Sequence, residues 1–316
     1  MAGHWSDCKP GSNTKARTMN GAAIGTAVGC ALLLAVITGY LWVRSFARRF
    51  LRAKGRRGNQ KPDTLGFPTT PFNVPRPEGT LRGALIHASA GPAPTVIFAH
   101  GWQSHASDML AYARPLIAAG YHVAVFDTLG HGESDPAAFA SIRHFVEDLL
   151  AVWRWTNTRA ECAPGIVLGG HSLGGTAAIL AAAEGGAEGL IPRAIVTVGS
   201  PSDPIRGTEE WLAAKGYPAA VMMKAVYRFW KPIIIWEPSR LKPLIRMHEV
   251  HAPLLVIHGS NDAQIGVHHA KLLAEASPGA RLELLDGADH WTVPKSPRFA
   301  EVIIAFLDEA FARKRA

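Results

Sequence analysis

The hydrophobic pattern changes character along the chain, and its first element is a long apolar run. Residues 21–43 form 23 consecutive positions without a charge. A helix of this length, at about 1.5 Å per residue, crosses the hydrocarbon core of a bilayer, and Tyr40 and Trp42 lie near one end as interfacial aromatics do. We expect a transmembrane anchor. The alternative is a secretory signal peptide, but its apolar region is usually shorter, and Ser45-Phe46-Ala47 resembles a cleavage site only faintly.

After a proline- and threonine-rich stretch at 62–77, which we interpret as a linker with at most one irregular edge strand, short apolar runs alternate with amphipathic segments. The runs predict strands and the amphipathic segments predict helices. The expected strands are 81–88, 95–99, 121–126, 166–168, 194–198, 254–257 and 281–285, and the expected helices are 107–119, 140–159, 176–184, 266–276 and 297–313. Such alternation predicts an α/β fold with a mostly parallel sheet covered by helices on both faces.

Residues 201–250 interrupt this alternation with a segment rich in tryptophan, methionine and isoleucine. We interpret it as a helical insertion that caps the sheet edge, where apolar side chains suit a flexible apolar ligand or simply pack the cap onto the main domain. The expected organisation is a tail at 1–20, an anchor at 21–43, a basic flank and linker at 44–79, and one domain at 80–316 with a cap at about 201–250.

The net charge of +8 is local. Eight of the 33 basic residues lie between positions 44 and 61 with no acidic residue among them, which leaves 25 basic against 25 acidic residues elsewhere. This pattern favours contact with a membrane surface and gives no support to a nucleic-acid-binding domain. The positive-inside rule places the side that follows the anchor in the cytoplasm.

The cysteines and the short motifs exclude several classes of site. Cys8, Cys30 and Cys162 match no metal spacing and no disulfide framework, so three free thiols are expected. The chain has no Walker loop, dinucleotide fingerprint or zinc spacing. No cofactor and no metal is expected.

The stretch Gly170-His171-Ser172-Leu173-Gly174 fits the pattern G-x-S-x-G. An expected strand precedes it and an alanine-rich helix follows, which is the setting of a nucleophile elbow. Ser172 is therefore the candidate nucleophile. The backbone N–H of Leu173, directly after it, is a candidate donor to an oxyanion.

A serine hydroxyl needs a general base, and the base needs an orienting group. His290 follows the last expected strand and Asp262 follows the strand before it, so both reach the sheet edge that carries the elbow. Asp203, after an earlier strand, is the alternative acid. We expect Asp289 to point elsewhere, and His100 and His131 to make local hydrogen bonds.

These pieces resemble an α/β-hydrolase-fold serine hydrolase from about residue 80 to the C-terminus. The matching motifs, in chain order, are His100-Gly101-Trp102, Asp127-Thr128-Leu129-Gly130-His131-Gly132-Glu133-Ser134, the elbow, Gly259-Ser260-Asn261-Asp262 and Asp289-His290. The resemblance implies an eight-stranded, mostly parallel sheet and the triad Ser172, His290 and Asp262. It also implies that the backbone N–H of Trp102 is the second oxyanion donor.

The sequence thus predicts a membrane-anchored serine hydrolase that cleaves carboxylic esters of lipid or other apolar acyl groups. The alternatives are a thioesterase, an aminopeptidase or amidase, for which Glu209, Glu210 and Glu237 are the candidate carboxylates in the cap, and a non-catalytic binding protein on the same scaffold. An aspartate nucleophile is disfavoured because the elbow carries Ser172. An acyltransferase-like pattern runs from His122 to Asp127, but we attribute it to chance because it lies along an expected strand.

Overall fold

The computed structural model describes residues 21–52, 58, 60–230 and 238–312. Cys8 and the tail, Lys54, Arg56 and Arg57 of the basic flank, and Ile233–Glu237 of the expected cap lie outside the described residues. The chain divides into two compact units, Met1–Ser45 and Phe46–Ala316.

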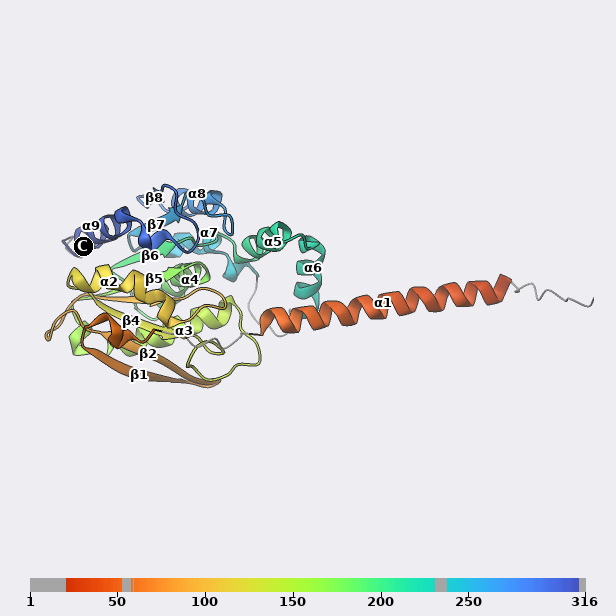
Figure 1. Cartoon of the computed structure of the whole chain (residues 1–316), viewed down its shortest axis with the longest axis horizontal. Coiled ribbons are helices and arrows are strands. Elements are labelled where there is room, and N and C mark those ends of the chain that lie inside the picture. The colour runs from red at the N-terminus through yellow and green to blue at the C-terminus, as the bar shows by residue number, and fades with distance from the viewer. Residues whose placement is uncertain (1–20, 53–57, 59, 231–237, 313–316) are drawn as a thin grey trace, which may run out of the picture. The chain divides into compact units, whose positions relative to one another are not determined.

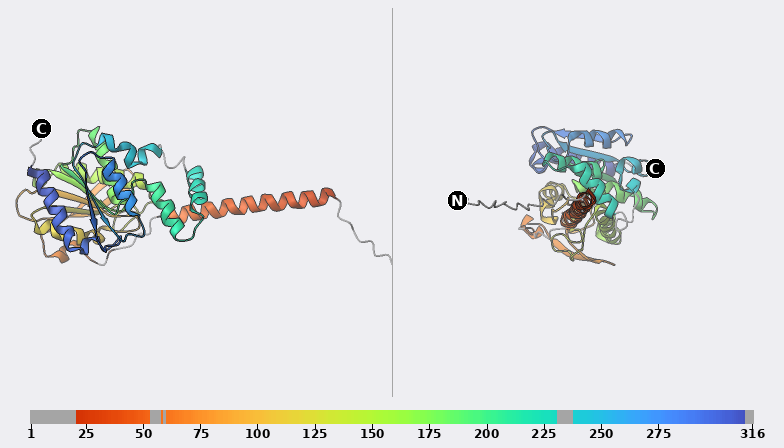
Figure 2. Two further views of the ribbon diagram at one scale, coloured as in Figure 1. Left: turned by 90° about the horizontal axis from the view of Figure 1, so that it is seen from above. Right: turned by 90° about the vertical axis from the view of Figure 1, so that its right-hand side faces the viewer.

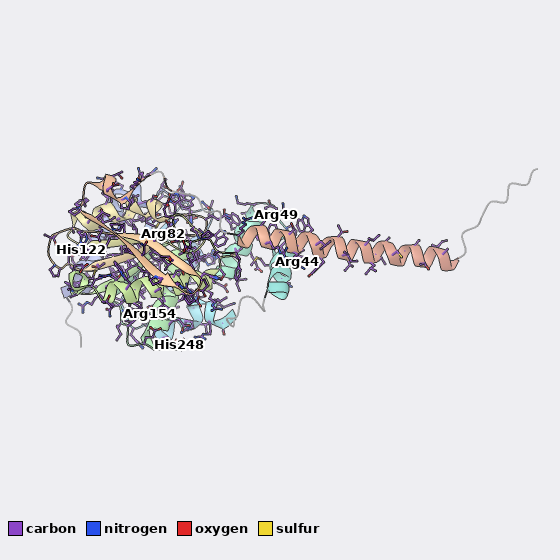
Figure 3. All side chains as sticks on the ribbon, turned by 90° about the horizontal axis from the view of Figure 1, so that it is seen from below. Arg44, Arg49, Arg82, His122, Arg154 and His248 are labelled. Atoms are coloured by element: carbon purple, nitrogen blue, oxygen red, sulfur yellow. The ribbon has the colours of Figure 1, made fainter. Side chains whose placement is uncertain are left out.

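The first helix, α1 (Gly21–Leu51), contains a candidate membrane span at Ala23–Phe46 with a mean hydropathy of 2.0 and no buried residue in its most apolar window. By length and composition it is suited to cross a bilayer, and a signal sequence would meet the same criteria. Arg44 and Arg49 are exposed near its C-terminal end (Figure 3).

One eight-stranded sheet organises the second unit, with the strand order β1-β2-β4-β3-β5-β6-β7-β8 (Figure 1). Strands β1, β2 and β4 pair antiparallel, and all pairings from β4 to β8 are parallel. The expected eight-stranded, mostly parallel sheet is therefore confirmed. The strands are β1 (Thr69–Arg76), β2 (Gly79–Ile86), β3 (Thr95–Ala99), β4 (His122–Asp127), β5 (Ile166–His171), β6 (Ala194–Val198), β7 (Leu254–Gly259) and β8 (Arg281–Leu285).

The sheet begins earlier than the expected domain boundary at residue 80. Strand β1 lies in the segment interpreted as a linker, but it is a regular strand that pairs with β2 along its whole length. Pro71 and Pro75 obscured it, because proline weakens a strand assignment. An edge strand tolerates proline, since its outer N–H groups have no ladder partner to lose.

Helices cover both faces of the sheet (Figure 2). Alternate residues of one strand point to opposite faces, so in β3 Val96 and Phe98 pack into one core while Ile97 and Ala99 pack into the other. The first core holds α2 (Leu110–Ala118) and α9 (Pro297–Ala312), and the second holds α3 (Ile142–Asn157), α4 (Leu173–Gly186) and α8 (Val267–Glu275). Because both faces are covered, the central strands are fully buried.

The described residues between β6 and β7, which fall in the segment interpreted as a cap, are largely helical. This segment contains α5 (Pro204–Ala214), α6 (Ala219–Trp230) and α7 (Pro243–Arg246), together with the short 3₁₀ turns η4 (Pro238–Leu241) and η5 (Met247–Glu249). The other 3₁₀ turns are η1 (Pro62–Leu65), η2 (Ala106–Met109), η3 (Ala160–Cys162) and η6 (Val293–Lys295). Since β5, β6, β7 and β8 run parallel, the loops after their carboxyl ends gather at one edge of the sheet.

Candidate active site

Ser172 occupies the sharp turn between β5 and α4 in a strained backbone conformation, with φ 54° and ψ −122°. A non-glycine residue at positive φ is uncommon and persists only where the surrounding structure enforces it. Here the amide of Ser172 donates to the carbonyl of Val198 at 2.8 Å. A Cβ on Gly170 would lie 2.3 Å from the backbone carbon of Gly174, so the strand and helix meet too closely for any side chain. This geometry is that of a nucleophile elbow.

His290 and Asp262 meet at the same sheet edge, in the loops that follow β8 and β7. Nδ1 of His290 lies 2.7 Å from Oδ2 of Asp262, and both side chains are almost completely buried. The other carboxylate oxygen of Asp262 accepts the amides of Gln264 and Ile265, each at 2.9 Å. These two amides hold the carboxylate in one orientation and leave Oδ2 for the imidazole.

The surroundings keep Asp262 ionised. Burial works to raise the pKa of this carboxyl, but the hydrogen bond and charge of His290 and the amide of Ile265 hold the pKa below its usual value. A second histidine, His258, lies 3.4 Å from Oδ2 through its Nε2 atom. Its Nε2 donates to the carbonyl of Ile265 at 2.8 Å, and burial lowers its pKa, so it faces Asp262 as a neutral ring.

Ser172 and His290 line one cavity of about 240 Å³. The cap helices supply much of its wall through Ile205 and Trp211 of α5 and Met223 of α6. Among the described lining residues there is no acidic or basic side chain apart from His290. The cavity is therefore an apolar chamber with the serine and the histidine as its main reactive groups.

The two expected oxyanion donors border this cavity. Leu173 is the first residue of α4, where backbone N–H groups have no partner inside the helix. Trp102 also lines the cavity, and a Cβ on the preceding Gly101 would lie 3.0 Å from Cβ of Ser172. Among the described non-glycine residues, positive φ occurs at Ser172 and at Gln103, which directly follows Trp102. Backbone strain therefore marks both turns that meet at the cavity.

The alternative acids are engaged elsewhere. Asp203 caps α5 by accepting the amides of Ile205 and Arg206, and it pairs with Lys242 at 2.8 Å. Asp289 accepts the backbone amides of Trp291 and Thr292 and the hydroxyl of Thr292, each at 2.9 Å. Of the three aspartates, the structure brings only Asp262 to His290.

His100 and His131 make local hydrogen bonds. His100 donates from Nδ1 to the carbonyl of Gly101 at 2.7 Å and accepts the amide of Thr128 at Nε2 at 3.1 Å. Nδ1 of His131 lies 2.9 Å from the hydroxyl of Thr128. Burial lowers the pKa of His100 to about 4 and that of His131 to about 3, so both are neutral supports of the loop before Trp102.

Two supporting histidines were not anticipated from the sequence. The first is His258, described above, and the second is the elbow residue His171. His171 is fully buried, and its Nε2 lies 2.8 Å from the carbonyl of His290, so this nitrogen carries the proton and donates it. Burial lowers the pKa of His171 to about 3, which keeps the ring neutral. Its partner is 119 residues away in the chain, and no local pattern in the sequence signals such a contact.

Comparisons with known proteins agree with this architecture. A family model described as "Serine aminopeptidase, S33" matches residues 90–222. The human protein ABHD12B is 26% identical over 238 residues, which cover 69% of this chain and 62% of that protein, so the match spans less than two thirds of the relative.

Solved structures with the same fold include two enzymes of different description. The esterase Pf2001 of Pyrococcus furiosus is 23% identical with a TM-score of 0.62, covering 81% of this chain and 98% of that chain. A structure described as a membrane phospholipase A, a bacterial virulence factor, is 19% identical with a TM-score of 0.55, covering 90% of this chain and 98% of that chain. The sheet order, the elbow and these matches show that the chain is an α/β-hydrolase-fold protein.

Proposed function

We propose that this protein is a membrane-anchored serine hydrolase that cleaves carboxylic esters through an acyl-enzyme on Ser172. One observation carries the proposal. The serine of a strained elbow lines the same cavity as His290, and the far side of that imidazole is bound to a buried carboxylate, Asp262. A nucleophile, a base and an orienting group arranged in this way are the parts that acyl transfer requires.

The hydrogen bonds assign the protons. Asp262 as a carboxylate only accepts, so Nδ1 of His290 is the donor and Nε2 keeps its lone pair. Nε2 takes the proton of Ser172 as its oxygen attacks the carbonyl carbon, and then delivers that proton to the departing alcohol. Water enters and attacks the acyl group by the same route, which releases the acid and restores the serine. Asp262 stabilises the imidazolium that forms in each half-reaction.

The tetrahedral intermediates carry a negative oxygen that needs fixed donors. The backbone N–H groups of Leu173 and Trp102 are the proposed donors, since both residues border the cavity beside Ser172. A backbone donor does not depend on the side chain, so the Trp102 indole is free to shape the acyl site. This chemistry involves no cofactor.

The cavity wall supports an apolar acyl group. Trp211, Met223 and Ile205 present hydrocarbon and aromatic surface to a chamber whose lining carries no ionised side chain among the described residues. An uncharged acyl chain loses nothing by entering such a site, whereas a charged substrate loses its hydration without compensation. The solved esterase and the membrane phospholipase A, which share the fold, fit the same substrate class.

A serine aminopeptidase or amidase is the second candidate, because the matched family model bears that description. Recognition of a free amino terminus requires a carboxylate in the cavity. The described lining residues include no carboxylate. Of the glutamates considered, Glu210 is paired with Arg206 and two histidines. Glu237 lies outside the described residues. An ester or a thioester is therefore preferred to a peptide, and a purely binding role leaves the Ser172–His290–Asp262 arrangement unexplained.

Membrane attachment through α1 is part of the proposal. The uncharged run at 21–43 followed by eight basic residues supports a single span with the hydrolase unit on the cytoplasmic side. The protein should stay in the membrane pellet after alkaline carbonate extraction, and added protease should reach the hydrolase unit only after sealed cells are opened. Release of the protein into the supernatant would contradict the anchor. Digestion of the hydrolase unit in intact cells would contradict the proposed orientation.

Labelling with a fluorophosphonate tests the central claim. The full-length protein in detergent should react, Ser172→Ala should not, and Ser89→Ala, which removes an exposed loop hydroxyl, should react like the wild type. Labelling that persists in folded Ser172→Ala protein would refute the serine-hydrolase assignment.

A panel of substrates then tests the leaving group and the acyl chain. Rates on p-nitrophenyl esters should rise as the acyl chain lengthens beyond acetate, and aminoacyl p-nitroanilides should be poor substrates. A strict preference for acetate would refute the apolar acyl site, and faster cleavage of the anilides would favour the aminopeptidase.

A further inference from the structure

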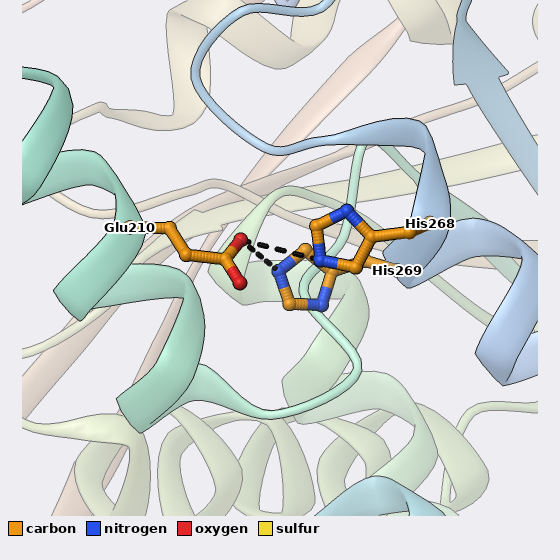
Figure 4. Close-up of side chains that lie close together, drawn as sticks. All are labelled: Glu210, His268 and His269. Atoms are coloured by element: carbon orange, nitrogen blue, oxygen red, sulfur yellow. Dashed lines mark hydrogen bonds and ion pairs between the residues drawn. The ribbon is translucent and has the colours of Figure 1, made fainter.

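Three ligand-type side chains converge outside the cavity, at the junction of the cap and the main body. Glu210 comes from α5, and His268 and His269 come from the first turn of α8 (Figure 4). Oε2 of Glu210 lies 3.2 Å from Nε2 of His268 and 3.1 Å from Nε2 of His269. One atom from each residue fits within 4.8 Å of the others.

We propose that Glu210, His268 and His269 bind a divalent transition metal of the zinc class. Two imidazole nitrogens and one carboxylate oxygen are a ligand set that zinc uses, with a water molecule completing four-coordination. Zinc–ligand bonds of about 2.0–2.1 Å in a tetrahedron place neighbouring ligand atoms about 3.3 Å apart. The contacts of 3.1 and 3.2 Å to Oε2 are close to that separation, and the three ligand atoms all lie within 4.8 Å of one another.

The groups behind the ligands are those that a metal site needs. The hydroxyl of Ser202 lies 2.8 Å from Nδ1 of His269 and can accept its proton, which leaves Nε2 free to coordinate. The Ser202 amide donates to the same Nδ1 at 3.2 Å, so metal binding requires the tautomer with the proton on Nδ1, in which the hydroxyl accepts and the amide contact is lost. Arg206 donates to Oε1 of Glu210 at 2.8 Å, which orients the carboxylate and leaves Oε2 for the ion.

The burial of the ligands suits capture from solution. The side chain of His269 is fully buried, whereas those of His268 and Glu210 are 44% and 35% exposed. The buried imidazole fixes the inner side of the site, and the outer side remains open to an arriving ion and to its fourth ligand. Sequence spacing gave no sign of the site, because Glu210 lies 59 residues before His269.

The position of the site gives the metal a structural consequence. Helix α5 lines the cavity through Ile205, Thr208 and Trp211, and α8 directly follows the loop that carries Asp262. A bound ion would tie the cap helix to the main body beside the catalytic edge. The expected result is a more stable cap wall, whether or not the proposed ester hydrolysis is correct.

Zinc binding to the full-length, untagged protein in detergent tests the proposal. After treatment with a chelating resin, titration with zinc chloride and elemental analysis should give about one tightly held zinc per chain, and zinc should raise the thermal midpoint until EDTA is added. Glu210→Gln and His269→Gln each remove a ligand and should weaken zinc binding by on the order of 100-fold. Ser202→Ala removes a group that orients a ligand and should weaken zinc binding by about 10–100-fold.

Two controls make the outcome decisive. His251→Gln removes an exposed histidine outside the cluster and should bind zinc like the wild type, and Ser172→Ala should do so too, which separates metal binding from hydrolysis. The Ser202→Ala variant keeps all three ligands, so it tests the site even if a ligand variant fails to fold. Zinc binding that is unchanged in the cluster variants, or wild-type binding only at millimolar zinc, would overturn the proposal as adventitious.

Discussion

Two glycines on one helix should respond in opposite directions to the same substitution. A Cβ on Gly174, in the first turn of α4, would lie 2.3 Å from the carbonyl oxygen of Ala99 and 2.5 Å from that of His100. Both obstacles are backbone atoms at the end of β3, so the new methyl group must move by about 1 Å to reach an ordinary contact. Gly186, near the other end of α4, is exposed, and a Cβ there meets nothing within 4 Å.

The magnitudes follow from these contacts. Gly186→Ala should stabilise the protein by about 0.5–1 kcal/mol, because alanine loses less backbone entropy than glycine in a helix. Gly174→Ala gains the same helix propensity but overpacks a backbone contact, which costs about 1–3 kcal/mol or more. The shift also separates the loop that carries Trp102 from Ser172, and a displacement of about 1 Å in such a site costs on the order of 100-fold in rate.

Urea unfolding followed by tryptophan fluorescence, together with initial rates on p-nitrophenyl butyrate, compares the two variants. The free energies of unfolding should differ by about 1–3 kcal/mol or more, with Gly174→Ala the lower, because the propensity gain is common to both variants and cancels. Gly186→Ala should keep the wild-type rate. If Gly174→Ala matches Gly186→Ala in both stability and rate, the close approach of α4 to β3 is not what positions the elbow.

Three further predictions concern the groups around the imidazole. Asp262→Asn should lower kcat for ester hydrolysis by about 10³–10⁴-fold, because an amide favours the wrong tautomer of His290. The control Asp203→Asn alters only a helix cap and the pair with Lys242, so it should keep most of the rate. Equal losses in the two variants would contradict the assignment of Asp262 as the acid. His171→Leu removes the donor to the His290 carbonyl and should lower kcat about ten-fold at unchanged KM. His171→Gln should restore kcat, because its amide still donates. A loss of stability with unchanged kcat would show that this residue has only a packing role. The pKa of His171 is about 3, below its ordinary value. Below about pH 6.5 the unfolded chain therefore binds a proton at this residue that the folded chain does not bind. The free energy of unfolding consequently falls as the pH falls. Between pH 8 and 5.5 the wild type should therefore lose about 1.4 kcal/mol more than His171→Gln in urea unfolding, and equal losses would refute the buried neutral ring.

The candidate catalytic edge of the sheet was predictable because its signals in the sequence are local. Each candidate residue directly follows an apolar run that reads as a strand, and carboxyl ends of parallel strands share one edge. Ser172, Asp262 and His290 could therefore be grouped from their positions after expected strands and their order in the chain. The structure adds the 2.7 Å contact between the last two and shows why Asp203 is not the partner, since a helix cap and Lys242 occupy it.

The sequence by itself determined the alternating α/β pattern, the apolar N-terminal helix and the residues of the elbow, because burial on both faces of a parallel sheet leaves continuous hydrophobic runs that chain order preserves. Only the tertiary structure decided that β1 joins the sheet despite its prolines, that His171 supports His290, and that Glu210 meets two histidines of α8. These features depend on contacts between segments far apart in the chain. A local pattern records which residues are buried, whereas the packing of the whole sheet and its helices determines which residues meet.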